Sequence, residues 1–270
     1  MKTIKNIAIA LLLAFAPGVA HSQCGTKNTA FGSGEYLSYN LYYNWKFVWV
    51  KAGTASMYTV ATTYKGHRGY KSSLITRGST RADKFFVLRD TLLCYTTNDL
   101  SPLYYRKGAH EGKRYYVDEL FYTYGGTGVN VKQHQLKANG KSTWKNHHSK
   151  ICVYDMMSIF LRARSYDAAS WRKGYTIAVP LADGDKTINA RLRYNGKVNV
   201  KADNGHTYRT LSLSYIENED GDWKEIVRFY VTDDTNHIPV RLDLFLKFGT
   251  AKAFLSSYKG VRSPITSLVK

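Results

Sequence analysis

The chain has 270 residues, with 39 lysines and arginines against 20 aspartates and glutamates, so its formal net charge is +19. No linker, repeat or shift in composition divides it, which excludes a string of separate domains and favours one large domain, a normal size for an all-β protein. The basic residues are spread along the chain rather than gathered in one tract, so a basic tail is excluded as well.

The first 23 residues have the pattern of a secretory signal peptide. Lys2 and Lys5 form a positive start, residues 7–15 an apolar core, and residues 16–22 an exit of mostly small side chains. This core is too short to span a bilayer as a helix, which needs about 20 residues, so a retained signal anchor is the weaker alternative. We therefore expect an exported protein, periplasmic or associated with the outer membrane, with a single mature domain of residues 24–270.

Export decides which partners the positive charge can have. Nucleic acid is not available to an exported protein, whereas anionic lipid headgroups, lipopolysaccharide and acidic glycans are. A plain solvated basic surface explains the charge equally well. The chain is not expected to be an integral membrane protein, because residues 201–270 lack a terminal aromatic strand and end in a polar tail.

Three cysteines, Cys24, Cys94 and Cys152, cannot all pair within one molecule. Cys24 raises the alternative of a lipid anchor, but Gln23 stands where a lipobox requires a small residue. Cys94 lies in an apolar run typical of a strand, and Cys152 opens a helical run. Both are therefore predicted to be small buried hydrophobic side chains rather than partners in a disulfide framework.

The clearest alternation of apolar and polar residues runs from Leu37 to Trp49. It predicts one long strand whose aromatic face lines the inside of a strongly curved sheet. Phe85, Val87 and Leu92 are predicted to be core residues, and residues 108–112 a hairpin turn. Five further strands are predicted before residue 137, over residues 57–64, 70–76, 84–95, 115–124 and 129–136.

Residues 137–150 are predicted to be a basic polar loop, and residues 151–164 are the one segment with a helical pattern. Met156, Met157, Phe160 and Leu161 gather on one stripe of that helix. Asp155 stands where it can cap the first turn. Two arginines near the helix C-terminus suit the negative end of its dipole, or an anionic ligand at the sheet mouth, namely Arg162 and Arg164.

Short alternating strands and tight turns resume after the helix. The Asn195-Gly196 and Asn204-Gly205 pairs predict hairpin turns, and residues 217–222 form an acidic hairpin tip. The long run from Leu242 to Phe248 is the last clear strand before a short closing one. Together these patterns predict a mainly β fold, a strongly curled antiparallel β-roll or incomplete barrel packed on one short central helix.

An inward aromatic face can be plain core, or it can line a cavity for an apolar or sugar ligand. Core is the favoured interpretation of the two. If the face does bind a ligand, we expect its contacts to come from four aromatic residues and from the two helix arginines, namely Tyr39, Tyr43, Trp45, Trp49, Arg162 and Arg164.

Nothing in the sequence has the pattern of a known catalytic motif, a phosphate loop or a metal site, so no cofactor and no metal are predicted. Asp233, Asp234 and His237 lie close together and are the one candidate set for acid–base chemistry. A tight turn explains them better, because aspartate side chains often bond their own backbone there. His147 and His148 lack a third ligand at a useful spacing.

With the strands and the helix placed, the mature chain resembles an exported Gram-negative envelope family, domain of unknown function 3108. The resemblance rests on segments 31–39, 52–55, 154–162 and 231–241. It implies a curled β-roll packed on a helix, and it implies no activity. We expect a buried pairing of Glu35 with an arginine. The family's recurring residues, taken here as structural, are Gly34, Glu35, Asp155, Arg162, Asp233, Asp234, Pro239 and Arg241.

The favoured functional hypothesis is a non-enzymatic envelope protein that binds an anionic or amphipathic ligand, namely lipid, lipopolysaccharide or glycan. The first alternative is a structural or assembly factor that contacts another envelope protein through the sheet edge or the basic surface. The second alternative is an enzyme of glycan or cell-wall material that uses Asp233, Asp234 and His237.

Overall fold

The computed structural model of the protein describes residues 24–45, 48–246 and 249–269. The predicted signal peptide, residues 1–23, lies outside them. Within them the chain forms one antiparallel sheet of fourteen strands and a two-stranded ribbon, β10 (Leu181–Asp183) with β11 (Lys186–Ile188). From one edge to the other, the strands of the large sheet are β8 (Ser142–Ser149), β7 (Gly128–Leu136), β6 (Arg114–Gly125), β5 (Pro102–Glu111), β4 (Leu88–Thr97), β3 (His67–Gly78), β2 (Val48–Tyr64), β1 (Glu35–Trp45), β16 (Gly249–Lys259), β15 (Pro239–Leu246), β14 (Asp222–Thr232), β13 (Thr207–Glu219), β12 (Ala190–Lys201) and β9 (Thr176–Ala178).

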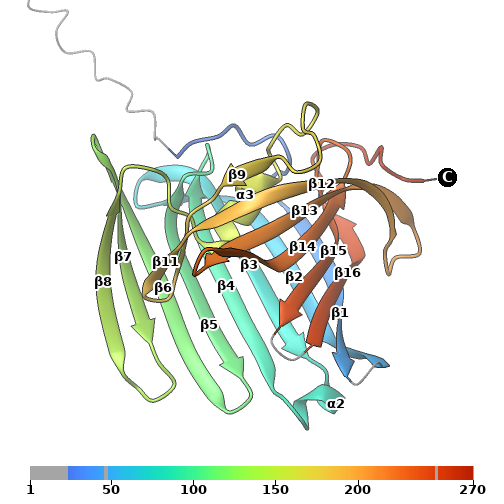
Figure 1. Ribbon diagram of the computed structural model, residues 1–270, viewed down its shortest axis with the longest axis horizontal. Helices are drawn as coiled ribbons and strands as arrows, with labels where there is room; N and C mark the ends of the chain where they lie inside the picture. Colours follow the sequence, from blue (N-terminus) through green and yellow to red (C-terminus); the bar gives the residue numbers. More distant parts are fainter. Residues whose placement is uncertain (1–23, 46–47, 247–248, 270) are drawn as a thin grey trace, which may run out of the picture.

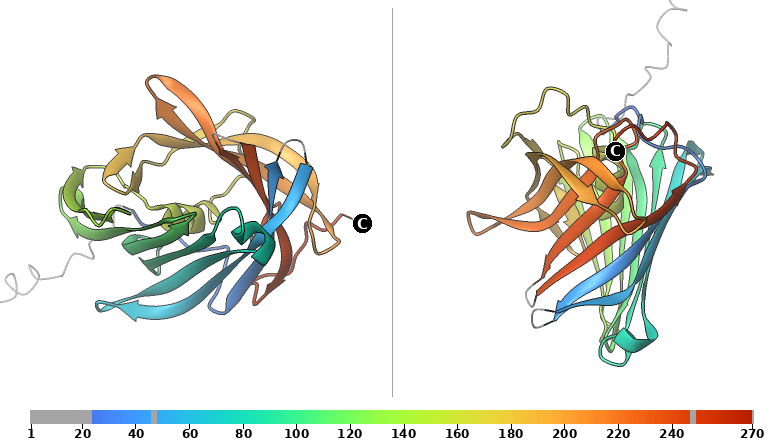
Figure 2. Two further views of the ribbon diagram at one scale, coloured as in Figure 1. Left: turned by 90° about the horizontal axis from the view of Figure 1, so that it is seen from below. Right: turned by 90° about the vertical axis from the view of Figure 1, so that its right-hand side faces the viewer.

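The large sheet curls on itself without its two edges meeting, as the predicted incomplete barrel requires (Figures 1 and 2). One half, from β1 to β8, is a tall wall of up-and-down hairpins, and the strands from β16 to β9 curl back over it. Helix α3 (Met156–Ala163) packs inside the curl against β4 and β10. The edges are β8 and the three-residue β9.

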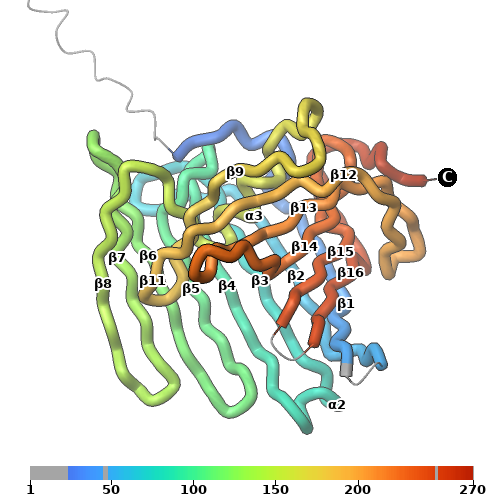
Figure 3. Tube along the Cα trace, viewed as in Figure 1, coloured from blue at the N-terminus to red at the C-terminus, as the bar shows by residue number. Residues whose placement is uncertain are grey.

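The two ends of the roll differ. Residues 24–34, the loop 233–238 and the final segment 260–269 lie together at the upper end in Figure 3, which we call the closed end. Arg262 there donates a hydrogen bond to the Asn28 carbonyl at 2.9 Å. The opposite end, which we call the open end, consists of hairpin connections, among them the short helix α2 (Thr80–Asp83) that joins β3 to β4.

Helix α3 begins at the predicted cap. The Asp155 carboxylate accepts the backbone N–H groups of Met157 (2.9 Å) and Ser158 (2.7 Å), and the Ser158 hydroxyl closes the capping box. The apolar stripe differs from the prediction: Met157 and Leu161 are buried, but Met156 is 44% exposed. Ile159 is buried instead of Met156, because Ile159 packs on a second cluster of buried residues under β12 and β13.

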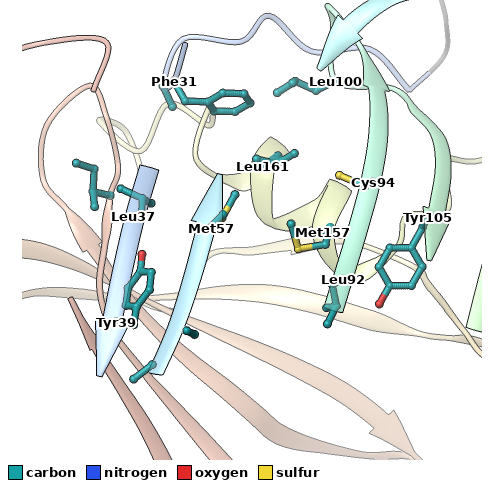
Figure 4. Close-up of a cluster of buried hydrophobic side chains, with 14 of the residues drawn as sticks. Phe31, Leu37, Tyr39, Met57, Leu92, Cys94, Leu100, Tyr105, Met157 and Leu161 are labelled. Atoms are coloured by element: carbon teal, nitrogen blue, oxygen red, sulfur yellow. The ribbon is translucent and has the colours of Figure 1, made fainter. Parts of the chain in front are cut away.

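The main core fills the space between the wall and α3 (Figure 4). Leu37 and Tyr39 from β1 enter it, as the alternation predicts, and Leu92 is also buried there. The prediction for Phe85 is wrong. This side chain is 91% exposed, because it follows α2 at the open end, beyond the reach of the core.

Three segments differ from the sequence-based prediction. The run from Leu37 to Trp49 is two strands, since Trp49 lies on β2 and pairs with Asn44 of β1. Residues 142–149 form edge strand β8 rather than a loop. Asn195-Gly196 makes a bulge inside continuous strand β12 rather than a hairpin, with Gly196 at φ +107°.

The prediction for Cys152 is also wrong, because Cys24 and Cys152 form a disulfide across 128 positions of the chain. A disulfide-bonded sulfur cannot carry a lipid, so the structure also contradicts a lipid anchor on Cys24. Only Cys94 is a free, buried thiol among the described residues, which agrees with its predicted role as a small hydrophobic side chain.

Candidate functional site

Tyr39, Tyr43 and Trp49, three of the four aromatic residues that were predicted to share a ligand face, lie in different environments. Tyr39 is buried in the core, and its hydroxyl has no hydrogen-bond partner. Tyr43 is half-buried farther along β1, whereas the Trp45 side chain lies outside the described part of the structure. Trp49 is 40% exposed at the open end, where the Lys252 ammonium lies 4.1 Å from its ring centre. The inward part of this face is therefore filled core.

The Arg164 side chain is buried and bonded to other residues of the fold. Its guanidinium makes two bonds to the Glu35 carboxylate, at 2.6 and 2.9 Å, and it also donates to the Asn236 carbonyl at 3.0 Å. Both charged side chains are buried. This is the expected pairing of Glu35 with an arginine. Because the guanidinium is buried and bonded within the fold, the geometry favours a structural role for Arg164 over contact with a ligand.

Arg162 is also engaged within the protein. It donates to the Cys24 carbonyl and to the Tyr166 hydroxyl, and its guanidinium lies over the rings of Tyr154 and Tyr166. Together with the disulfide, this arginine ties Cys24 and the segment that follows it to the helix. The geometry therefore favours a structural role for Arg162 over contact with an anionic ligand.

The loop that holds Asp233, Asp234 and His237 behaves as a turn. Asp233 forms ion pairs with Lys197 and Arg209, both at 2.8 Å. Asp234 accepts bonds from its own loop and from Ser267. The His237 ring contacts the Arg164 carbonyl, and burial lowers its pKa. The three side chains therefore bond to different partners. Among the described residues of the whole chain, no group of histidine, cysteine, aspartate and glutamate side chains is arranged to hold a metal ion.

The remaining recurring residues of the resemblance also have structural positions. Gly34 lies at φ +92°, a conformation that favours glycine, just before β1. Pro239 begins β15. Arg241 pairs with the buried Asp243 at 2.6 Å and lies over the Tyr230 ring.

The inner face of β4 to β6 is polar toward the open end and rich in carboxylates. Burial raises the pKa of Asp90 to about 6, and its Oδ1 atom has no hydrogen-bond partner. Burial also raises the pKa of Asp118. Lys107 lies 3.8 Å from Glu111, which the Tyr116 hydroxyl also bonds. An anionic ligand would meet several carboxylates here, so the inner face does not suit one.

Asp155 makes the stability of the fold depend on pH. Burial raises the pKa of this carboxyl from its ordinary 3.8 to about 6. The folded state therefore favours the neutral acid, so its contribution is complete below about pH 4 and is lost as the pH rises through about 6. The loss amounts to at most about 3 kcal/mol.

Asp155→Asn keeps the cap, because an asparagine carbonyl accepts the same backbone bonds. Urea unfolding at several pH values should show that the variant loses less stability than the wild type between pH 4 and pH 7. If the free energy of unfolding of the two proteins changes with pH in the same way, ionisation of Asp155 does not destabilise the fold.

Exposed apolar side chains lie beside the hairpin connections of the open end, and the connections themselves can be followed in Figure 1. Each of four neighbouring connections supplies at least one of these side chains. The rim residues are Val48, Trp49 and Val50 at the start of β2, Phe85 and Phe86 after α2, Tyr115 at the start of β6, and Phe245 and Leu246 at the end of β15.

Exposed basic side chains alternate with this apolar rim. Helix α2 carries one carboxylate at the rim, that of Asp83. Arg89 is bonded to this carboxylate and holds the pKa of Asp83 below its ordinary value. A cleft of about 480 Å³ opens beside the rim around Arg89 and Asp90, and another of about 590 Å³ opens around Arg262. The exposed cations of the rim are Lys51, Arg81, Lys84, Lys113 and Arg114.

Comparison with solved structures places the chain among open β-barrel-like folds. It resembles a β-barrel-like protein of domain of unknown function DUF1849 from Brucella abortus at a TM-score of 0.52 and 12% identity, over 87% of this chain and 100% of that one. A candidate lipoprotein from Parabacteroides distasonis ATCC 8503 is matched at a TM-score of 0.37 and 10% identity, over 87% of this chain and 99% of that one.

A comparison with curated proteins finds no relative of this chain. No helix in the part of the chain that the structure describes is long and apolar enough to cross a bilayer. Residues 38–256, which run from β1 to β16, match a family described as protein of unknown function. The chain therefore belongs to the DUF3108 family.

Proposed function

We propose that this protein is a non-enzymatic envelope protein that binds an anionic lipid surface through the rim of its open end. The observation that carries the proposal is the rim itself, in which aromatic and aliphatic side chains from four neighbouring hairpin connections are exposed at one end of the roll. The closed end is occupied instead by the disulfide and by the chain termini of the mature domain.

The two kinds of rim side chain suit the two layers of a lipid surface. Aromatic residues such as Trp49 and Phe85 favour the boundary between headgroups and acyl chains, where their rings leave water. Basic residues near an anionic surface each contribute about 1 kcal/mol at physiological ionic strength. Five cations and eight apolar side chains together are sufficient for reversible attachment at the surface.

The other ligand positions fit an anionic molecule less well. The inward aromatic face is packed core, and the inner face near Asp90 is lined by carboxylates. Strand addition by a protein partner would use the eight-residue edge strand β8, but Lys145 on that strand points inward to Asp185 at 3.1 Å. Inward charges on an edge strand oppose further pairing. The lipid surface is therefore the better-supported partner.

Vesicle co-sedimentation tests the proposal. The wild type should bind vesicles of phosphatidylglycerol and phosphatidylcholine, and bind pure phosphatidylcholine weakly, because the cations need anionic headgroups. Replacing Phe85 and Phe86 with serine should weaken binding at least about tenfold, which corresponds to 1.4 kcal/mol. Lys51→Glu with Lys84→Glu should weaken it similarly and reduce its dependence on salt.

Matched control variants distinguish vesicle binding through the rim from nonspecific adsorption of the protein to vesicles. Ile151→Ser removes a side chain that is 62% exposed outside the rim, and Lys173→Glu reverses an exposed charge before β9. Both controls should bind vesicles like the wild type. Equal loss in the controls, or full binding by the rim variants, would refute the assignment of the rim as the lipid-binding surface.

A further inference from the structure

A row of six aromatic rings crosses the outer face of the wall, on the side away from α3. Within one strand, side chains alternate between the two faces of a sheet. Tyr105 and Leu120 are buried in the core, so their chain neighbours Tyr104 and Phe121 face outward. The row, which no part of the proposed lipid surface uses, consists of Tyr64 on β2, Tyr95 on β4, Tyr104 on β5, Phe121 on β6, His134 on β7 and Trp144 on β8.

The rings form a continuous row in which neighbouring rings pack on one another. Centroids of successive rings lie 4.3 Å apart between Tyr64 and Tyr95, 6.2 Å between Tyr95 and Tyr104, and 5.1 Å between Tyr104 and Phe121. Trp144 then lies 6.1 Å from Phe121 and stacks on His134 at 4.2 Å. Trp144 is 52% exposed, at the edge strand of the sheet.

A polar network beneath the rings fixes their orientation. The Glu119 carboxylate accepts the Tyr104 hydroxyl at 2.5 Å and contacts the His134 Nδ1 atom at 2.9 Å. The His134 Nε2 atom contacts the Ser142 hydroxyl at 2.9 Å. These bonds hold the pKa of Glu119 below its ordinary value, although burial opposes them. Rings that are held in place before a ligand arrives lose little entropy on binding.

The charges around the row are positive at both of its ends. The Lys65 ammonium lies 5.5 Å from the centre of the Tyr64 ring, and the Lys132 ammonium 4.6 Å from the Trp144 ring. Arg106 lies 3.9 Å from Glu119, which is the carboxylate inside the row and is already bonded. A partner of this surface should therefore be extended, negatively charged and able to pack on the exposed ring of Trp144.

We propose that the row is a binding platform for an acidic polysaccharide. The C–H groups on the flat side of a sugar ring carry partial positive charge and stack on the negative face of an aromatic ring. The carboxylates of a uronic-acid chain would meet Lys65 and Lys132. The exposed ring of Trp144 offers a sugar a surface to pack on, and cross-strand packing alone requires neither this exposed ring nor lysines at both ends.

Affinity electrophoresis and titration calorimetry with polygalacturonate test this platform, with dextran as the neutral comparison. The wild type should bind polygalacturonate and not dextran. Trp144→Ala should weaken binding about tenfold or more, Trp144→Phe should retain most of it, and Lys132→Ala should weaken it and lower its salt dependence. The control is Tyr175→Ala, which removes a ring that is 49% exposed outside the row.

Each outcome decides the proposal. Selective loss in the Trp144 and Lys132 variants supports it, provided that their melting temperatures match that of the wild type. No binding of polygalacturonate, or equal loss in Tyr175→Ala, overturns it. Stronger binding of a single-stranded oligonucleotide, or a dimer that Trp144→Ala dissociates, overturns it in favour of another occupant. The rim variants should retain polysaccharide binding, so failure of one site is distinguishable from failure of the other.

Discussion

Replacing Arg164 with methionine should lower the free energy of unfolding by about 3–5 kcal/mol. The variant would leave the Glu35 carboxylate buried without its two guanidinium bonds, which are 2.6 and 2.9 Å long in the folded protein. It would also free the Asn236 carbonyl, which accepts from the same guanidinium. Urea titration of the wild type and the variant measures the difference.

Two further variants show whether the buried charge is the cause. Adding Glu35→Gln to the methionine variant should recover much of the loss, since a neutral amide costs less to bury than an unpaired carboxylate. Arg89→Met breaks an exposed pair with Asp83 and should leave the midpoint unchanged. A similar loss at both arginines would show that general surface charge matters, and not the buried pair.

Replacing Cys24 with serine should cost nearly as much. The disulfide to Cys152 closes a loop across 128 positions of the chain, and a loop of this length restricts the unfolded chain by about 5 kcal/mol at 25 °C in the chain-entropy model. Measured losses for native disulfides fall between about 2 and 5 kcal/mol. Chemical unfolding of the variant, and of the wild type with and without reductant, measures the effect.

The free cysteine provides the control for this experiment. Cys94→Ala leaves the disulfide in place, so the variant should keep the full response to reductant. Cys24→Ser should have lost that response. If reductant destabilises all three proteins equally, the effect does not come from the Cys24–Cys152 bond. A disulfide of this kind is typical of proteins that fold in an oxidising compartment, which supports the proposed export.

The contacts that stabilise the fold and the proposed lipid-binding rim lie at different ends of the molecule. The buried pair of Glu35 with Arg164 and the disulfide both lie on the α3 side of the molecule, where the N-terminal segment and the loop at Asn236 meet. Neither is near the exposed rim at Phe85. Changes at the rim should therefore alter binding without unfolding the protein, which makes the vesicle experiment interpretable.

The local sequence determined the features that depend on neighbouring residues. Alternation placed Leu37 and Tyr39 on the inner face of a strand, because side chains alternate with a period of two. Asp155 marked the start of α3, because only a short polar side chain before an apolar stripe makes both capping bonds. The antiparallel, curled class of the fold followed from many such strands joined by tight turns.

Only the tertiary structure decided which distant residues meet. Glu35 and Arg164 are 129 positions apart, and Cys24 and Cys152 are 128, so no local pattern names either pair. Nor does periodicity distinguish an apolar residue of the core from one at a hairpin tip, which is why Phe85 was misplaced. The aromatic row joins six strands, and register between strands is set by long-range pairing rather than by the sequence within each strand.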